Sequence, residues 1–262
     1  MTDSTENIYA KSLKSFFEEV ALLSRFNIRF LKEFLKPPYE FKEIIRQCYA
    51  MGYKSLPLIG ITGFIVGLVL TIQSQPTLAQ FGAESWLPAM VGVSIIREMG
   101  PVITALIFAG KVGSGIGAEL ASMNVTEQID AMEVSGTNPF KYLVITRVIA
   151  CTLMLPLLVI AGDAISLYGG YIGVNIKSDV NMHLYLNKIF NKLEFSDILP
   201  AFFKTFFFGY GVGIIACFKG YQSNRGTEGV GEAANSAVVM GSLSVFVLDM
   251  IAVQLTSLFY TY

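Results

Sequence analysis

The sequence contains little charge for its length. Only 15% of its 262 residues are Asp, Glu, Lys or Arg, whereas an average soluble domain carries about 25%. Hydrophobic residues make up 53% of the chain, which is more than one soluble core of this size would bury. Lys and Arg together number 19 and Asp and Glu number 20, so no basic excess indicates nucleic-acid binding. The composition indicates a polytopic membrane protein.

Residues that build metal sites, disulfides and nucleotide loops are also scarce. The chain has one histidine, His183, and its three cysteines (Cys48, Cys151 and Cys217) show no CxxC spacing, so we expect no metal, no cofactor and no disulfide framework. No Gly-x-x-x-x-Gly-Lys-Ser/Thr loop occurs. If ATP drives this protein, another subunit must therefore hydrolyse it. The single histidine also makes an intramembrane lipid enzyme a poor alternative.

Long apolar runs predict five transmembrane helices and an all-α fold. Residues 55–83 contain no charged side chain, and the first helix is expected from Leu56 to about Gln75, close to the ~20 residues that a bilayer requires. Alternation with a period of two is absent, which argues against strands. The other four spans are expected at 101–121, preceded by a short apolar piece at 86–96, and at 148–174, 198–218 and 237–259.

Basic residues predict the orientation of these spans. Nine of the 19 Lys and Arg residues precede Leu56, and two more lie in each of the segments 122–147 and 219–236. The opposite side carries only Lys177, Lys188 and Lys192. The positive-inside rule therefore predicts a cytoplasmic N-terminus and a periplasmic C-terminus.

The first 55 residues are expected to form amphipathic helices that lie in the membrane interface. Apolar residues recur there at roughly helical spacing between charged ones. Pro37 and Pro38 are expected to end the first helix, and a second short amphipathic piece covers 40–53. The alternative is a helix packed on a partner protein. Residues 56–262 would then form the membrane domain with its five spans. The apolar positions are Phe16, Val20, Leu23, Phe30 and Phe34.

Six charges lie inside the predicted spans, three of each sign. Such charges are costly in lipid and usually face a protein interior or a wet cavity. Arg97 and Glu98 adjoin Pro101, whose missing N–H predicts a kinked segment that lines a polar pocket. Arg97 suits a phosphate and Glu98 suits a cation or an amine headgroup, although a purely structural ion pair remains the alternative. Lys204 is a further candidate for headgroup contact. Structural pairing is the simpler interpretation for Lys111, Asp163 and Asp249.

A short acidic amphipathic helix is predicted at 126–134, on the cytoplasmic side between the second and third spans. Thr126 is a candidate N-cap and Gly136 a candidate stop. The helix is either a solvated connector or an element that docks into a partner. In the docking interpretation the carboxylates meet basic residues while the apolar side chains fill a slot. The candidate coupling residues are Glu127, Gln128, Ile129, Asp130, Met132 and Glu133.

Two long blocks of the sequence are distinctive, IIREMGPVITALIFAGKVGSGIGAELASM at 95–123 and VTEQIDAMEVSGTNPFKYLVITR at 125–147. They resemble the MlaE (YrbE) family, the permeases of ABC transporters that move phospholipids between membranes. The likeness extends over about 55–259. The shorter matches are LPLL at 155–158, GG at 169–170, GY at 220–221, EGVG at 228–231, AVV at 237–239, and Asp249.

The resemblance implies a permease subunit rather than an enzyme, placed in the inner membrane of an outer-membraned bacterium and concerned with outer-membrane lipid asymmetry. It implies a second copy of the chain, a cytoplasmic ABC ATPase docked on 126–134, a periplasmic MCE-domain protein that is expected to be hexameric, and in some members a STAS-domain subunit. The phospholipid cavity would lie between the two permeases. The rival function is a proton-coupled secondary transporter that uses Glu98, Asp163 and Asp249 as carriers.

Overall fold

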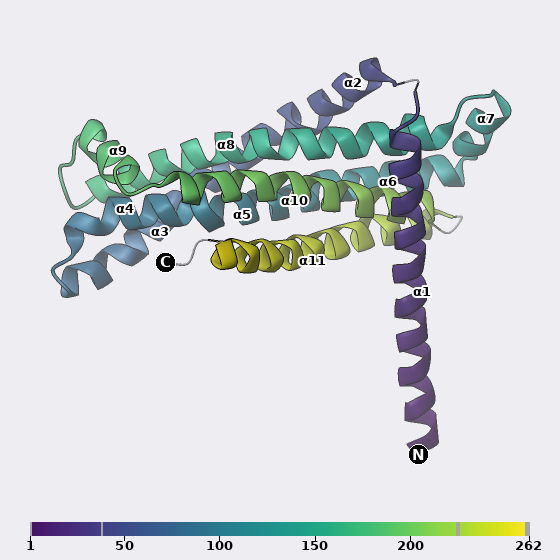
Figure 1. Cartoon of the computed structure of the whole chain (residues 1–262), viewed down its shortest axis with the longest axis horizontal. Coiled ribbons are helices and arrows are strands. Elements are labelled where there is room, and N and C mark those ends of the chain that lie inside the picture. Colours follow the sequence, from purple (N-terminus) through teal and green to yellow (C-terminus); the bar gives the residue numbers. More distant parts are fainter. Residues whose placement is uncertain (1, 38, 224–225, 260–262) are drawn as a thin grey trace.

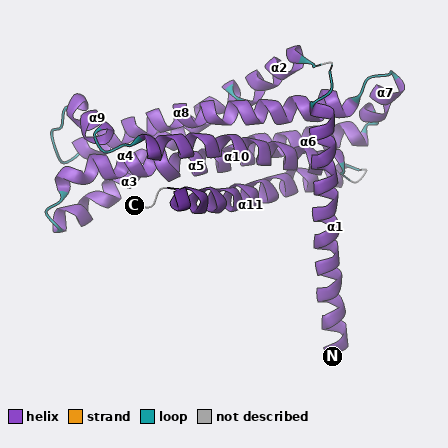
Figure 2. Cartoon of the chain, viewed as in Figure 1, coloured by secondary structure: helices purple, strands orange, loops and turns teal. Residues whose placement is uncertain are grey.

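The structure is a computed structural model that describes residues 2–37, 39–223 and 226–259. Within these ranges every regular element is a helix (Figure 2). Five helical stretches are long and apolar enough to cross a membrane, which confirms the predicted all-α membrane fold. They are Phe41–Gln80, Glu84–Val125, Phe140–Asn175, Phe195–Tyr221 and Thr227–Leu258.

The long helices run side by side as a bundle (Figure 1), with α8 packed between α3 and α10. The principal members are α3 (Leu56–Gln80), α8 (Thr146–Asn175), α10 (Phe195–Tyr221) and α11 (Thr227–Phe259). Close approach between α3 and α8 depends on small residues. A methyl group on Gly67 would lie 1.8 Å from the carbonyl oxygen of Ser166, so the two backbones touch there.

Short helices gather at the two ends of the bundle (Figure 1). One end carries α2 (Phe41–Met51), the 3-10 turn η1 (Tyr53–Ser55) and α7 (Gln128–Val134). The opposite end carries the 3-10 turn η2 (Glu84–Trp86) and α9 (Met182–Phe190). The two sets of connections thus lie on alternate sides, as five successive spans require.

The second span differs from its prediction, because the piece at 86–96 and the span at 101–121 form one continuous helical stretch. A π turn joins them where the kink was expected: the N–H of Gly100 bonds to the carbonyl of Ile95, five residues back. This wider turn lies where Pro101 supplies no N–H, so the helix continues through the proline. The stretch consists of α4 (Leu87–Ser94), η3 (Ile95–Met99), α5 (Gly100–Phe108), the π turn η4 (Ala109–Gly113) and α6 (Ser114–Val125). A third π segment, η5 (Phe140–Ile145), leads into α8.

The predicted N-terminal helix is present as α1 (Thr2–Phe34), which runs across the bundle rather than along it (Figure 1). Its C-terminal half is attached to the bundle by aromatic rings. The Phe26 ring lies 5.1 Å from that of Phe140 and 5.6 Å from that of Phe218. An ion pair between Glu19 and Lys219 adds a polar contact.

The apolar positions predicted along α1 do not all face one environment. Phe30 is buried against the bundle and Leu23 packs beside it, whereas Val20 and Phe34 are exposed. The side chain of Phe16 lies outside the described residues. So do Pro38, predicted to end this helix, and residues 260–262, which include the C-terminus predicted to be periplasmic.

Candidate functional site

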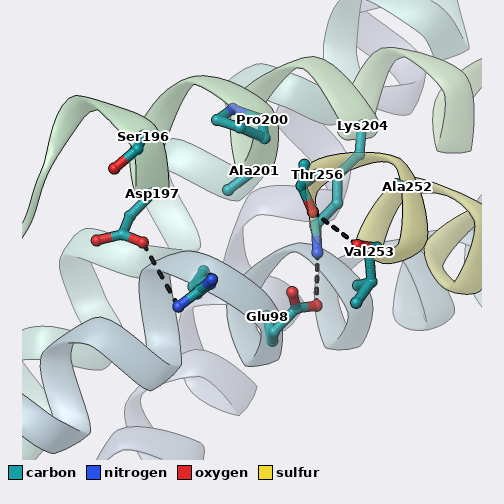
Figure 3. A pocket seen from close by; sticks show the side chains of 10 residues that line it. Glu98, Ser196, Asp197, Pro200, Ala201, Lys204, Ala252, Val253 and Thr256 are labelled. Atoms are coloured by element: carbon teal, nitrogen blue, oxygen red, sulfur yellow. Dashed lines mark hydrogen bonds and ion pairs between the residues drawn. The ribbon is translucent and has the colours of Figure 1, made fainter. Parts of the chain in front are cut away.

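A cluster of charged side chains lies at the junction of η3, α10 and α11. At its centre is Lys204, whose side chain is only 5% exposed. Its ammonium group donates to Glu98 Oε2 at 2.6 Å (Figure 3). It also donates to Asp249 Oδ1 at 2.9 Å. Lys204 therefore does not extend to the membrane interface: two carboxylates from two other helices hold it inside the bundle.

A second ion pair borders this cluster. Arg97, which precedes Glu98 in the π turn, places a guanidinium nitrogen 3.5 Å from Asp197 Oδ1. Asp197 belongs to the first turn of α10, where it completes a capping box with Glu194. Neighbouring residues of one turn thus reach two different partners, because adjacent helical positions point in directions about 100° apart.

The charged residues line a pocket together with apolar and hydroxyl side chains of α10 and α11. Its enclosed volume is about 30 Å³, which holds only about two water molecules. The exposure of its charged side chains is uneven, since Arg97 and Glu98 are 43% and 40% exposed whereas Lys204 is 5% exposed. The lining residues are Arg97, Glu98, Ser196, Asp197, Pro200, Ala201, Lys204, Ala252, Val253 and Thr256.

The structure thus brings together the three residues predicted to contact substrate, Arg97, Glu98 and Lys204, and adds Asp249 to them. The two other intramembrane charges lie elsewhere. Lys111 donates to the backbone carbonyl of Lys54, while Oδ1 of Asp163 is buried and has no hydrogen-bond partner among the described residues. The expected structural ion pairing is therefore wrong for Lys111 and Asp163, because neither side chain reaches an opposite charge, whereas Asp249 does pair, with Lys204.

Two buried residues that form ion pairs, Asp197 and Arg147, were not predicted from the sequence. Asp197 lay just outside the predicted fourth span, although an acidic residue at the start of a helix is a recognisable capping signal. Arg147 was counted only as a loop charge. Its side chain is 2% exposed and bonds to Glu119 at 3.0 Å and to the carbonyl of Leu143 at 2.9 Å. No sequence signal pairs Arg147 with Glu119, since the contact joins α6 to α8.

The predicted coupling helix is present as α7, but it begins two residues later than expected. The hydroxyl of Thr126 donates back to the carbonyl of Ser122, so Thr126 closes α6 instead of capping α7. Glu127 takes a left-handed conformation with φ of 56° and starts the new helix. Gly136, with φ of 81°, stops it as predicted.

The apolar face of α7 is turned toward its own chain. Ile129 is only 4% exposed and Met132 packs against the same core, which corrects the expectation that Ile129 fills a slot in a partner. The exposed apolar side chain is Val134, at 91%. Three carboxylates and an amide are exposed around it, at Glu127, Gln128, Asp130 and Glu133.

A metal centre finds no support in this geometry. Across the part of the chain that the structure describes, no three His, Cys, Asp or Glu side chains are grouped to hold an ion. The charged cluster instead contains its own cations. Its formal charge is −1, from three carboxylates (Glu98, Asp197 and Asp249) against Arg97 and Lys204.

The five-span bundle, with its internal charged cluster and a short helix at one end, defines a multi-pass membrane protein. Comparison with known proteins gives the family: residues 44–255 match the family model "Permease MlaE", and the chain belongs to this family. It is 39% identical over 249 residues to a probable ABC transporter permease protein of Rickettsia prowazekii, covering 95% of this chain and 96% of that one. It is 37% identical over 213 residues to the intermembrane phospholipid transport system permease protein MlaE of Haemophilus influenzae, covering 80% and 81%. The chain is therefore an ABC transporter permease, in agreement with the expected non-enzymatic subunit.

Proposed function

We propose that this permease moves phospholipids between the inner and outer membranes of a bacterial envelope and thereby maintains outer-membrane lipid asymmetry. The observation that carries the proposal is the charged cluster around Lys204. Three helices place two cations and three carboxylates there, at a depth where uncompensated charge is costly. The relative from Haemophilus influenzae, named as a phospholipid transport permease, supports the same substrate class.

The exposed part of the cluster suits a zwitterionic headgroup. Arg97 and Glu98 present opposite charges side by side, each about two-fifths exposed. The guanidinium group provides paired donors for phosphate oxygens, and the carboxylate accepts from an amine. Lys204, buried behind them, orients Glu98 through the 2.6 Å contact. In this proposal Arg97 and Glu98 contact the lipid, and Lys204 acts mainly by positioning Glu98.

One chain provides only part of the binding site. The enclosed volume of about 30 Å³ is too small for a phospholipid headgroup, so the site requires a second wall. We propose that a second copy of the chain supplies it. The adjoining helix α11 exposes an apolar face that suits such a contact, with Leu243, Phe246, Val247 and Met250 each more than half exposed.

The end of the bundle that carries α7 is proposed to face the cytoplasm, in agreement with the distribution of Lys and Arg. A separate ATPase would dock there, with its basic residues near the carboxylates of Glu127, Asp130 and Glu133 and an apolar pocket around Val134.

Helix α1 would lie in the membrane interface, as its course across the bundle suggests (Figure 1). A periplasmic MCE-domain protein, expected to be hexameric, would meet the opposite end, and a STAS-domain subunit is a further expected partner. The chain itself is expected to carry no cofactor.

Transport by the reconstituted complex tests the proposal directly. The permease is co-expressed with its ATPase, purified and placed in vesicles that contain a fluorescent phospholipid. We expect lipid transfer that requires ATP and persists when a protonophore collapses the proton gradient. ATP-independent transfer that stops with the gradient would instead establish the proton-coupled alternative. Of the three candidate carriers in that alternative, Glu98 and Asp249 already pair with Lys204, and Asp163 alone has no hydrogen-bond partner for Oδ1 among the described residues.

A further inference from the structure

A second hollow lies beside the charged pocket, on a flank of the bundle lined by residues of the second span, α8 and α10. Its volume is about 250 Å³, and eleven of its twelve lining residues are apolar. The remaining one, Asp163, directs Oδ1 toward the backbone of Gly100: a methyl group there would lie 1.7 Å from that oxygen. The hollow, called the flank groove below, therefore offers an almost entirely apolar surface.

The flank groove lies well inside the membrane-spanning part of the molecule. Its α8 wall extends from Val159 to Leu167, within a helix that ends at Asn175. At 1.5 Å per residue, Leu167 is about 12 Å from that helix end and the wall itself is about 12 Å long. Phe190, at the end of α9, and Leu193 also line the groove. The α8 wall of the groove thus lies within a helical stretch that is long and apolar enough to cross a membrane.

Lipid can enter the groove from the side. Ala164 and Ile160 belong to its lining and are exposed, and Ile160 is 52% exposed. Two buried residues, Val159 at 3% and Leu167 at 9%, form its interior wall. An apolar hollow of this size that opens into hydrocarbon gains dispersion contacts when a chain fills it.

The groove and the charged pocket are neighbours across a single layer of side chains. Ala201 lines both. Along the π turn, Ile96 faces the groove while the next residue, Arg97, faces the pocket, and along α10 Ile198 and Asp197 divide in the same way. The ion pair between Arg97 and Asp197 therefore joins the π turn to α10 on the pocket side of this layer. A molecule with a charged head and an apolar tail would find both surfaces within one molecular length.

We propose that the flank groove is a binding site for one acyl chain of a phospholipid whose headgroup lies at Arg97. The inference rests on the proposed transport function, because it supplies the tail site of the same substrate. The chain would point from the level of Leu193 toward Val159, which is the direction of a lipid whose headgroup lies on the α9 side. The groove also gives lipid a lateral route to the charged pocket from the surrounding membrane.

A photoreactive phospholipid with a diazirine in one acyl chain tests the site in the complete complex. After irradiation, labelled peptides are identified by mass spectrometry. We expect labelling of Val159 and Leu167, which lie inside the groove, and competition by unlabelled phospholipid. Ala164→Trp fills the entrance from the lipid side and should reduce this labelling at least fivefold. Leu157→Trp is the matched control: Leu157 is 55% exposed, lies two turns away on the same face of α8, and does not line the groove.

The outcomes separate the groove from the proposed function. Labelling confined to exposed positions such as Leu157, in a complex that transports lipid, overturns the acyl-chain site and leaves the function standing. Groove labelling in a complex that transports no lipid overturns the function and leaves a lipid-binding groove. Ala164→Cys provides a further check, because a disulfide-linked dimer formed under mild oxidation would assign the groove to a second copy and overturn the proposal. Equal labelling in Ala164→Trp and wild type would do the same.

Discussion

Lys204 and Arg147 are both almost completely buried, yet their surroundings differ. Lys204 meets two carboxylates, and the more exposed of them, Glu98, is 40% exposed. Arg147 meets one carboxylate, Glu119, which is 52% exposed, and a carbonyl of its own helical segment. Lys204 joins three helices around a pocket, whereas Arg147 fastens α6 to α8 beside the short helix α7.

The difference separates two uses of buried charge. Arg147 has a solvated partner and does not line the charged pocket around Lys204. Its contacts therefore serve to hold helices together. Lys204 lies behind two exposed, oppositely charged side chains in a pocket. Its two carboxylates would be left without their cation if it were removed. A buried cation that lines a pocket together with exposed charges of both signs is therefore the better candidate for function.

The largest effect is expected from Lys204→Ala. It leaves Glu98 and Asp249 without their shared cation, and breaking a buried pair in this way costs about 3–5 kcal/mol. We expect a clear fall in the thermal midpoint of the detergent-purified protein, together with loss of lipid transport. The triple variant Lys204→Ala, Glu98→Gln, Asp249→Asn should recover stability without transport. If transport also returns, the cluster is structural only.

Arg147→Met should destabilise the protein less, by about 1–3 kcal/mol, because water can solvate the remaining Glu119 carboxylate. Transport per folded molecule should stay near wild type, measured in vesicles after correction for the amount of folded permease. Glu119→Gln serves as the milder control. A tenfold loss of transport per folded molecule would contradict the distinction between the two buried cations.

Arg97→Ala should have the opposite effect to Arg147→Met, because it should lower transport with little loss of stability. The Arg97 side chain is 43% exposed and lies 3.5 Å from Asp197, and ion pairs with a solvent-exposed member typically contribute about 0–1 kcal/mol. Transport should fall about tenfold, as expected when one charged contact worth about 1.4 kcal/mol is lost. Arg97→Lys keeps the charge without the paired donors and should recover only part of the activity. Normal transport in Arg97→Ala would exclude headgroup binding at this residue.

The smallest effect on the permease itself is expected at Val134. Val134→Asp changes a side chain that is 91% exposed, so stability should stay unchanged. Co-purification of the ATPase should weaken by about 1–2 kcal/mol, as for an apolar anchor at an interface. Phe195→Asp, at an 82% exposed position near the opposite end, is the matched control and should leave ATPase binding intact. Equal ATPase recovery in both variants would show that α7 is only a connector.

Much of the fold was predictable because hydropathy acts along the chain. Each span must match the bilayer, so uncharged runs such as 55–83 identify helices without knowledge of their neighbours. The break near Pro101 was also predictable, although its form was not: the missing N–H permits either a kink or a π turn, and packing selects between them. In α7 the glycine stop at Gly136 was readable, while the start depended on Thr126 bonding back to Ser122.

The candidate site, like the fold, was predictable from the sequence only in part. The sequence by itself determined that charges occur inside the spans, that Arg97 and Glu98 adjoin a helix-breaking residue, and that an acidic helix connects two spans, because these properties belong to residue types and local spacing. Only the tertiary structure decided that Lys204 meets Glu98 and Asp249, residues 106 and 45 positions away. It also decided that Asp197, and not Glu98, is the partner of Arg97. The inward orientation of Ile129 and the apolar groove beside the charged pocket were likewise decided only by the tertiary structure. These contacts depend on how the helices cross and rotate against one another, and hydropathy does not specify that rotation.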